Sequence, residues 1–388
     1  MSSTRPTVAL LGATGSIGTQ TLDVLRRELD AFDLVAIAGG QRLGELAAIA
    51  KEFNVSHVGV VSADDRDHLR ALVGPQVDIV VGAEGLTQLS RCADVVVNAV
   101  VGFAGLPVTL SALEAGKRLA LANKESLIAA APLVAKVRAT SGAEILPIDS
   151  EHCAIHQCLA GSSAVAGHPD VRRLLLTASG GPFRGWSKEQ LQSVTKSDAL
   201  RHPTWSMGPK ITVDSSTLMN KGLEVLEASA LFAIEVDRVD VVVHPQSIVH
   251  SMVEYVDGAV LAQLSEPDMR LPIAYCIGSP MRLDHAWGRL DFSQAFSLAF
   301  EAPDREAFPA LDLAYAAARR GGAAPAWLSA ANEIAVDAFL NDQIPWARIV
   351  TLVADVMDLY DDDPLDSLED LFDNDATARR IAHGMVVR

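Results

Sequence analysis

The sequence predicts an α/β protein with three parts: a doubly wound parallel sheet at the N-terminus, a central α+β catalytic domain and a C-terminal helical bundle. Three observations lead to this prediction. A glycine-rich turn follows the first apolar strand, short apolar strands alternate with helical stretches over roughly the first 150 residues, and apolar residues from Pro309 onward recur at helical spacing. The 388 residues are enough for two or three domains.

Charge and cysteine content narrow the class of protein. The formal net charge of −17 argues against nucleic acid or an anionic membrane as a partner. It is compatible with a phosphorylated substrate, because a few Lys and Arg side chains set the local charge of a site. The 4 cysteines form no CxxC pattern, and the sequence contains no recognisable signal peptide or membrane-spanning run, so we expect reduced thiols and a cytoplasmic protein.

The N-terminal sheet is predicted from a strand, a turn and a helix in succession. Thr7–Leu11 is apolar, Gly12–Gly18 forms the turn, and a helical pattern follows. This succession is typical of a Rossmann-like domain, in which glycines let the backbone approach the pyrophosphate of a dinucleotide and the helix N-terminus attracts it. Another nucleotide is the alternative ligand. The later strands are predicted at Leu34–Ile37, His57–Val61, Asp78–Val81, Asp94–Val97 and Arg118–Leu121.

The end of the second strand indicates which cofactor binds. NAD-binding domains usually carry an acid here, whereas Ala38–Arg42 contains none, and Arg42 favours the 2′-phosphate of NADP. A solvated charge at a helix start is the alternative for Arg42. Farther along, Asn98–Gly102 is expected near the nicotinamide end of the cofactor. The adjacent Lys124 and Glu125 form either part of a site or a surface ion pair.

Two acidic residues follow a buried strand in the stretch Ile145–His152. In an extended chain, side chains two residues apart point the same way, so Asp149 and Glu151 are expected to converge. Two converging carboxylates repel each other unless a proton or a cation lies between them, and oxygen ligands suit Mg²⁺ or Mn²⁺. A solvated strand end is the alternative.

A third carboxylate lies in an apolar, helix-like run after Asp214–Thr217. Asn220 is four residues and Lys221 three residues before Glu224, so the three side chains share one helix face. Glu224 would complete the cation site with Asp149 and Glu151, while Asn220 and Lys221 would contact a polar substrate.

The central region contains two further candidate segments. Ser179 beside two glycines predicts an anion-binding turn, with a simple turn as the alternative. Arg201–Lys210 is polar, aromatic and broken by proline, which suits a mobile lid in which Trp205 and Met207 cover a ligand. His202 lies between these segments and is expected to belong to the site, with a structural histidine as the alternative.

The remaining elements complete the predicted organisation. Asp257-Gly258 signals a hairpin in a second, smaller sheet. Its strands are predicted at Val241–Val243, Ile248–Tyr255 and Val260–Leu264. Before them, a separate strand is predicted at Leu174–Thr177 and a loop at Gly161–Pro169. The predicted division is an NADPH-binding domain at 1–149, a catalytic domain at 150–277 with a mobile lid at about 179–209, a linker at 278–305 and a helical domain at 306–388.

These motifs occur in the order found in one enzyme family. The chain resembles the 1-deoxy-D-xylulose 5-phosphate reductoisomerases over nearly its whole length. The matching segments are Gly12–Gly18, Leu121–Ser126, Pro147–His152, Ser179–Phe183, Arg201–Met207, Asp214–Ser215, Met219–Glu224 and His244–Ser247.

The resemblance implies an NADPH-dependent oxidoreductase and isomerase of the non-mevalonate pathway to isoprenoid precursors. It would convert 1-deoxy-D-xylulose 5-phosphate to 2-C-methyl-D-erythritol 4-phosphate by retro-aldol cleavage, recombination and hydride transfer, with Mg²⁺, Mn²⁺ or Co²⁺. The implied assembly is a cytoplasmic homodimer without a nucleic-acid or membrane partner.

Site residues follow from the resemblance by position. The implied metal ligands are Asp149, Glu151 and Glu224. The implied catalytic residues are Lys124, Asp149, Glu151, His202 and Glu224. The implied substrate-binding residues are Lys124, Ser150, Glu151, Ser179, His202, Ser215, Asn220, Lys221 and Glu224. The implied cofactor-binding residues are Thr14, Gly15, Ser16, Ile17, Gly40, Gln41, Arg42, Asn123, Glu125 and Gly208. The family often has Lys-Asn or a similar pair where this chain has Gln41-Arg42, and Arg42 has the chemistry to meet the 2′-phosphate.

Two alternative functions compete with this interpretation. One is another metal-assisted NADP-dependent oxidoreductase, such as an oxidative decarboxylase or a semialdehyde dehydrogenase; the latter would need a reactive cysteine such as Cys153. The other is a non-catalytic nucleotide-sensing protein, against which the acidic residues argue because a sensor does not need a hard-cation centre.

Overall fold

The protein is described by a computed structural model that covers residues 5–160, 168–205, 207–362 and 365–387. The chain divides into two compact units. Unit 1 comprises Met1–Ser126, Val134–Cys153 and Asp268–Gly288, and unit 2 comprises Leu127–Leu133, Ala154–Pro267 and Arg289–Arg388. The division into domains at 149, 277 and 305 stays a prediction, and most of the predicted loop at Gly161–Pro169 lies outside the described residues.

Unit 1 is built on a seven-stranded parallel sheet with the order β4-β3-β2-β1-β5-β6-β7. Every expected strand is present within one or two residues. The strands are β1 (Thr7–Leu11), β2 (Asp33–Ala38), β3 (His57–Val60), β4 (Asp78–Val81), β5 (Val95–Asn98), β6 (Arg118–Leu121) and β7 (Glu144–Pro147). Leu10 pairs in register with Ile37 on one side and Val97 on the other, so β1 lies at the centre of the sheet.

Helices connect these strands and cover the sheet, because parallel strands need crossover connections. The helices are α1 (Ser16–Arg27), α2 (Leu43–Glu52), α3 (Ala63–Val73), α4 (Gly82–Leu89), η1 (Gly102–Gly105), α5 (Leu106–Glu114), α6 (Lys124–Val137) and α12 (Arg270–Gly278). The strand order grows outward from β1 first through β2 and then through β5. This reversal makes the sheet doubly wound, as predicted. In sheets of this kind, ligands generally bind at the carboxyl ends of the strands on either side of the reversal, here β1 and β5.

Unit 2 contains a four-stranded mixed sheet with the order β11-β10-β8-β9. Its strands are β8 (Val171–Ala178), β9 (Val239–Val243), β10 (Val249–Tyr255) and β11 (Val260–Leu264). β10 and β11 pair antiparallel around Asp257-Gly258, which confirms the predicted hairpin. Arg173 donates hydrogen bonds to Glu254 at 2.6 Å and to Asp240 at 2.7 Å, and so links β8 to both of its neighbours.

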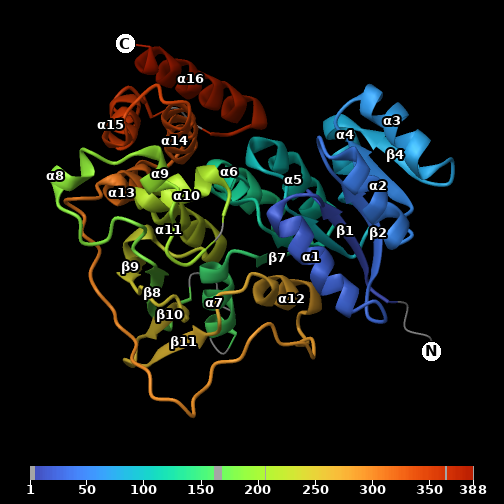
Figure 1. The fold of residues 1–388 in the computed structure, drawn as a ribbon, viewed down its shortest axis with the longest axis horizontal. Helices are drawn as coiled ribbons and strands as arrows, with labels where there is room; N and C mark the ends of the chain where they lie inside the picture. The colour runs from blue at the N-terminus through green and yellow to red at the C-terminus, as the bar shows by residue number, and fades with distance from the viewer. Residues whose placement is uncertain (1–4, 161–167, 206, 363–364, 388) are drawn as a thin grey trace. The chain divides into compact units, whose positions relative to one another are not determined.

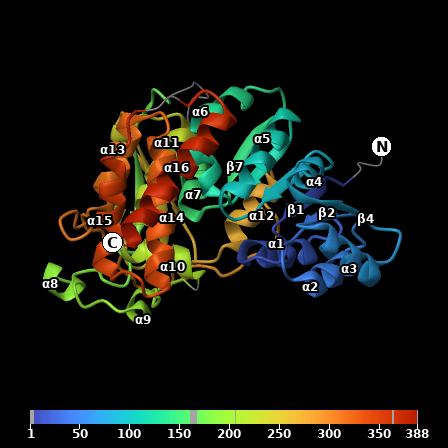
Figure 2. The same cartoon turned by 90° about the horizontal axis from the view of Figure 1, so that it is seen from above.

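Helices make up most of the rest of unit 2. They are α7 (Ser150–Leu159, shared with unit 1), α8 (Lys188–Leu191), α9 (Lys196–Ala199), α10 (Pro209–Ser216), α11 (Met219–Phe232), η2 (Val236–Arg238), α13 (Ala310–Arg320), α14 (Ala324–Leu340), α15 (Trp346–Met357) and α16 (Leu368–Val386). Helices α13 to α16 form the predicted C-terminal bundle, in which α14 contacts each of the other three (Figures 1 and 2). None of the helices in the described part of the chain is long and apolar enough to cross a membrane.

The histidine motif at His244–Ser247 anchors an irregular segment. The Nδ1–H of His244 donates to Ala299 O at 2.8 Å, while Nε2 accepts from the N–H groups of Ile248 and Val249. The side chain is fully buried and its ring stacks on Phe300 with 4.7 Å between the ring centroids. The motif is therefore part of the framework that holds the chain before α13.

Gly12 is required by the close approach of two loops at the reversal point. Its φ is +96°, and a Cβ atom built there would lie 2.3 Å from Ala99 O, in the loop after β5. We expect Gly12→Ala to destabilise unit 1 by about 1–3 kcal/mol, through strain at positive φ and overlap with the backbone. Urea unfolding followed by circular dichroism measures this change.

Gly44 provides a matched control in α2. A Cβ there meets none of the described atoms within 4 Å, so Gly44→Ala is expected to stabilise the protein by about 0.5–1 kcal/mol through higher helix propensity. Equal effects of the two substitutions would contradict the packing that we assign to Gly12.

Candidate active site

The glycine-rich turn of unit 1 presents a helix N-terminus to the reversal point of the sheet. Gly15 is the N-cap of α1 and has no side chain that could cap the helix. The first turn, from Ser16 to Thr19, is uncharged, so its backbone N–H groups and the positive end of the helix dipole suit a pyrophosphate. At Gly18 a Cβ would lie 2.2 Å from Gly12 O, which explains why the helix packs so closely on the turn.

Arg42 lies beside this turn, as the sequence suggested. Its guanidinium donates a hydrogen bond to Thr14 O and forms an ion pair with Glu45 at 3.2 Å. About half of the Arg42 side chain is exposed, and Gln41 is exposed as well. A Cβ at Gly40 would meet none of the described atoms within 4 Å, so the backbone before Arg42 is open to a ligand.

Asn123 is buried at the start of α6 and forms hydrogen bonds to two segments of the chain. Its Nδ2 donates to Val100 O and Gly102 O, both at 2.7 Å, and its Oδ1 accepts from the N–H of Ser126 at 2.9 Å. It therefore caps α6 and holds the loop after β5 in place. Glu125 lies in the first turn of the same helix and is half-buried.

The carboxylates of unit 1 converge through a helix cap rather than through an extended strand. Strand β7 ends at Pro147 and α7 begins at Ser150, so Glu151 is helical and the period-two argument for this pair was wrong. Asp149 Oδ1 accepts from the N–H groups of Glu151 at 3.1 Å and His152 at 3.3 Å, which is the geometry of an N-cap. An acid before a helix competes well for its free N–H groups, and this preference outweighs the extended pattern.

Lys124 and His152 hold the Asp149 carboxylate from two sides. Lys124 Nζ is 3.2 Å from Asp149 Oδ2, and His152 Nδ1 is 2.8 Å from Oδ1. Ser150 donates a hydrogen bond to Glu151 Oε2. His152 is fully buried and was not among the predicted site residues, although its position three residues after Asp149 was the available signal. Lys124, considered from the sequence together with Glu125, forms an ion pair with Asp149.

In unit 2, α11 carries the third carboxylate in a buried cluster. Glu224 is 2% exposed and Lys221 is 4% exposed, and Lys221 donates to Glu224 Oε2. Asn220 Nδ2 donates to Oε1 at 2.5 Å. The three side chains therefore share one helix face, which confirms the geometry predicted from their spacing.

Ser179 and His202 form a polar pair whose proton positions follow from the geometry. His202 Nδ1 accepts from the N–H groups of Thr204 at 3.2 Å and Trp205 at 2.9 Å, so the proton of the neutral ring is on Nε2. That N–H donates to Ser179 Oγ at 3.2 Å, which also accepts from Gly181 N at 3.2 Å. With both lone pairs engaged, the Ser179 O–H is directed away from them and is available as a donor to an anion.

Gly181 brings the Ser179 turn against the end of α10. Its φ is +70°, and a Cβ there would lie 2.6 Å from Ser215 O. Ser215 is partly exposed in the last turn of α10, while Asp214 and Ser216 on either side of it are buried. The polar groups of Ser179 and Ser215 are thus presented by adjacent backbone segments. Gly208 lies at the opposite end of α10 as its N-cap.

Models of one enzyme family match three stretches of the chain. The model described as 1-deoxy-D-xylulose 5-phosphate reductoisomerase matches residues 8–131, that of its C-terminal domain matches residues 145–232, and one described as DXP reductoisomerase C-terminal domain matches residues 264–381.

Curated relatives with the name 1-deoxy-D-xylulose 5-phosphate reductoisomerase match nearly end to end. The protein of Chloroherpeton thalassium is 47% identical over 380 residues, covering 97% of each chain. That of Xanthomonas axonopodis pv. citri is 50% identical over 380 residues, covering 96% of this chain and 95% of the relative.

Solved structures give the same result for the fold. The Zymomonas mobilis enzyme in complex with NADPH matches with a TM-score of 0.91 and 42% identity, covering 99% of each chain. A DOX-P reductoisomerase in complex with NADPH, fosmidomycin and magnesium matches with a TM-score of 0.90 and 42% identity, covering 98% of each chain.

The geometry at His202 predicts its protonation behaviour. Burial lowers the pKa of His202 from 6.5 to about 4, so the ring is neutral at physiological pH. Because the folded pKa lies below the unfolded one, this group stabilises the fold fully above pH 6.5 and loses that contribution as the pH falls from 6.5 towards 4. We expect ¹⁵N NMR to show the Nε2–H tautomer with no titration between pH 8 and 5.5.

The His202 signal is identified by its loss in a His202→Gln variant. A midpoint near pH 6.5, or a proton on Nδ1, would contradict the hydrogen bonds from Thr204 and Trp205.

Proposed function

We propose that this chain, which belongs to the 1-deoxy-D-xylulose 5-phosphate reductoisomerase family, converts 1-deoxy-D-xylulose 5-phosphate to 2-C-methyl-D-erythritol 4-phosphate. It does so with NADPH and a divalent cation, Mg²⁺, Mn²⁺ or Co²⁺. The structural observation that carries the proposal is the buried Glu224 carboxylate with Lys221 and Asn220 on the same helix face. A buried carboxylate on a polar helix face is costly and is typical of a site that binds a cation.

The chemistry of the donors fits a hard cation. Asp149 and Glu151 in unit 1 and Glu224 in unit 2 offer carboxylate oxygens, which Mg²⁺ and Mn²⁺ prefer. Asp149 is oriented by Lys124 and His152, and Glu224 by Lys221 and Asn220, so neither carboxylate turns freely. We assign the metal to Asp149, Glu151 and Glu224.

NADPH is assigned to the reversal point of the unit 1 sheet. Thr14, Gly15, Ser16 and Ile17 present the start of α1 to the pyrophosphate, and Arg42 meets the 2′-phosphate together with Gly40 and Gln41. Asn123 contributes to NADPH binding by holding the loop after β5. Glu125 and Gly208 are the remaining residues that we assign to the cofactor. The uncharged first turn of α1 and the position of Arg42 beside Thr14 support this assignment.

The phosphate of the substrate is assigned to unit 2. The O–H of Ser179, the partly exposed side chain of Ser215 and the amide of Asn220 would donate hydrogen bonds to the phosphate. Lys221 would supply the positive charge. His202 stays neutral and holds Ser179 through its Nε2–H. Neutral donors and one buried lysine suffice to bind a phosphate in this otherwise acidic protein.

The reaction needs a polarised carbonyl, an excluded solvent and a hydride donor. A bound cation would polarise the substrate oxygens and bound NADPH would supply the hydride. Lys124 and Ser150 hold the remaining substrate hydroxyls near Asp149 and Glu151. The segment Arg201–Lys210, with Trp205 and Met207, covers the substrate and excludes water, since a reactive enolate must not be protonated prematurely.

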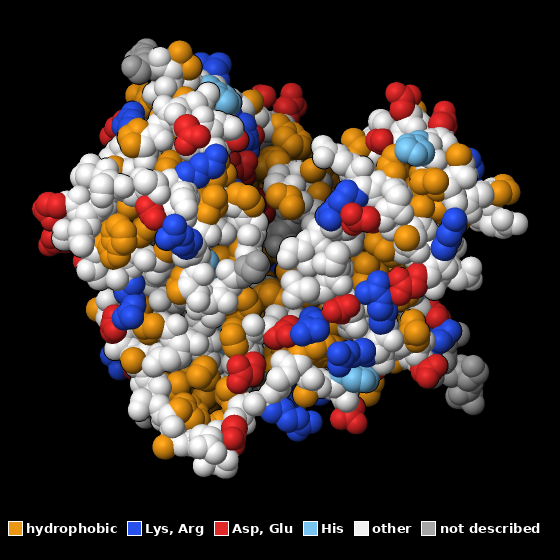
Figure 3. Space-filling model, viewed as in Figure 1, with side chains coloured by type: hydrophobic (Ala, Val, Ile, Leu, Met, Phe, Trp, Pro, Cys, Tyr) orange, Lys and Arg blue, Asp and Glu red, His pale blue; other side chains and the backbone are white. Residues whose placement is uncertain are grey.

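The protein is further proposed to act as a cytoplasmic homodimer. β11 is an edge strand on which Val260 and Leu261 are exposed. Hydrophobic side chains gather at the surface over β11 (Figure 3). An exposed apolar edge strand favours pairing with another chain, which supports a second copy as its partner. The 4 cysteines are free thiols, which fits a reducing compartment.

The test of the proposed function is NADPH oxidation with 1-deoxy-D-xylulose 5-phosphate and Mn²⁺, followed by absorbance. We expect oxidation that a chelator abolishes and that added metal restores. Glu224→Gln removes a ligand at nearly constant shape and should lower turnover at saturating metal by at least roughly a hundredfold. Glu189→Gln, at an exposed position on α8, is the matched control and should leave turnover unchanged.

Wild-type turnover by the Glu224→Gln protein at saturating metal would exclude Glu224 as a ligand. Release of CO₂ with formation of NADPH would instead indicate an oxidative decarboxylase. Tight NADPH binding without turnover or metal dependence would favour a nucleotide sensor.

Arg42 is predicted to set the preference for NADPH over NADH. Loss of one charge-assisted contact with the 2′-phosphate costs about 1.5–3 kcal/mol, so Arg42→Ala should raise the KM for NADPH roughly ten- to a hundredfold. The KM of this variant for NADH should stay within about twofold of the wild-type value. Steady-state kinetics with both cofactors measures this, and Arg66→Ala on the surface of α3 serves as the control. An equal change for both cofactors would place the 2′-phosphate elsewhere.

A further inference from the structure

We infer that Asn332, on α14 of the C-terminal bundle, is a positioning residue for substrate phosphate: it fixes the end of α10 on which Ser215 lies. The inference rests on the proposed function, because it concerns the phosphate-binding residues assigned there. Asn332 does not belong to the assigned site, and it lies 118 residues after Asp214, the residue that it contacts.

The contact is a buried, charge-assisted hydrogen bond. Asn332 Nδ2 donates to Asp214 Oδ1 at 2.7 Å, and the two side chains are 0% and 1% exposed. Lys210 Nζ lies 2.8 Å from the other carboxylate oxygen, Oδ2. A buried carboxylate requires such partners, so the orientation of Asp214 is fixed from both α14 and its own helix.

A second contact holds the other neighbour of Ser215. Trp346 Nε1, on α15, donates to Ser216 Oγ at 2.8 Å, and Ser216 in turn donates to Val213 O at 2.6 Å. Asp214 and Ser216 thus tie the last turn of α10 to α14 and α15, and Ser215 between them is left partly exposed. The backbone of Ser215 has little freedom to shift.

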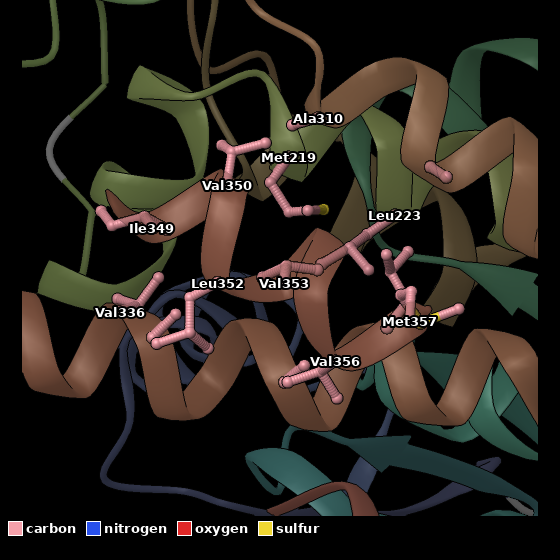
Figure 4. Close-up of a cluster of buried hydrophobic side chains, with 14 of the residues drawn as sticks. Met219, Leu223, Ala310, Val336, Ile349, Val350, Leu352, Val353, Val356 and Met357 are labelled. Atoms are coloured by element: carbon pink, nitrogen blue, oxygen red, sulfur yellow. The ribbon is translucent and has the colours of Figure 1, made fainter. Parts of the chain in front are cut away.

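The start of α11 depends on the same bundle. Met219 and Leu223, on either side of Lys221, are buried in the hydrophobic cluster formed with α13, α14 and α15 (Figure 4). A Cβ at Gly222 would lie 2.8 Å from Ala314 Cβ on α13. The bundle therefore sets the position of the helix that carries Asn220 and Lys221.

Between the two helices, Leu218 adopts a left-handed conformation with φ +60°. This conformation is unfavourable for a leucine and persists only where the surroundings enforce it. The turn at Leu218 fixes Ser215 relative to Asn220 and Lys221, and Leu218 is buried in the hydrophobic cluster that also contains residues of α14 and α15. Without Asn332 the turn can relax, and the donors to phosphate lose their alignment.

The experiment compares Asn332→Leu with the wild type at a temperature well below both unfolding midpoints. Misplacement of binding groups by a fraction of an ångström lowers productive binding, so we expect the KM for 1-deoxy-D-xylulose 5-phosphate and the inhibition constant of inorganic phosphate to rise roughly tenfold. The dissociation constant of NADPH should change less than about twofold, because all of its assigned residues except Gly208 lie in unit 1. The value of kcat should fall less than KM rises. Asn341→Leu, at the exposed end of α14, is the matched control and should change neither constant.

A reciprocal exchange separates positioning from simple stabilisation. Asn332→Asp places two carboxylates against each other and should weaken phosphate binding, whereas the double variant Asp214→Asn with Asn332→Asp restores an amide–carboxylate hydrogen bond. We expect the double variant to recover phosphate inhibition to within about threefold of the wild type. Trp346→Phe removes the bond to Ser216 at small change in volume and provides a second test if Asn332→Leu does not fold.

The outcomes distinguish this inference from the proposed function. If the wild type oxidises NADPH with the sugar phosphate, but Asn332→Leu and Trp346→Phe lower only the melting temperature and leave phosphate inhibition unchanged, Asn332 is merely structural and the inference is wrong. If the wild type shows no turnover, the proposed function fails. In that case ³¹P NMR titration with inorganic phosphate measures the effect of Asn332→Leu on binding directly, and absence of phosphate binding by the wild type overturns both.

Discussion

The free-energy cost of burying Glu224 is the constraint that determines where α11 begins, how it is registered and how it packs in unit 2. A carboxylate with 2% exposure is tolerated only if its charge is compensated and its oxygens are hydrogen-bonded. Lys221 and Asn220 meet these needs, but only because three- and four-residue spacing on a regular helix puts them on one face. The helix must therefore begin at Met219 and keep its register. That requirement places a left-handed leucine before it and a glycine, Gly222, where it packs against α13.

Local chemistry made much of this predictable from the sequence. The glycine-rich turn was recognisable because Gly12 and Gly18 are positions where backbone atoms leave no room for a Cβ. The Asn220, Lys221 and Glu224 cluster was predictable because helical spacing alone decides which side chains meet. The position of Arg42 beside Thr14 followed from the βαβ pattern, since the loops after β1 and β2 lie at the same edge of a parallel sheet.

Competing or long-range interactions decided the features that the sequence did not reveal. Asp149 and Glu151 matched an extended pattern, but the free N–H groups of α7 offered Asp149 a better partner, and the helix begins at Ser150, inside the stretch expected to be extended. His152 ends the same stretch, and its role depends on the helical geometry that brings its Nδ1 to the Asp149 carboxylate. Asn332 gave no signal, because its partner lies 118 residues away and only the packing of α14 on α10 brings them together.

The distribution of charge explains how an acidic protein can hold an anionic substrate. The overall charge of −17 opposes the approach of a sugar phosphate, and among the residues assigned to the phosphate Lys221 is the one cation. The site that we propose would use a hydroxyl whose lone pairs are already occupied, an amide, and one lysine that a carboxylate holds in place, with a neutral histidine supporting the hydroxyl. Preorganised neutral donors avoid the desolvation cost of several buried cations, but they bind only if their geometry is accurate. Accuracy of this kind requires a rigid support, and the C-terminal bundle behind α10 and α11 has the contacts to provide it.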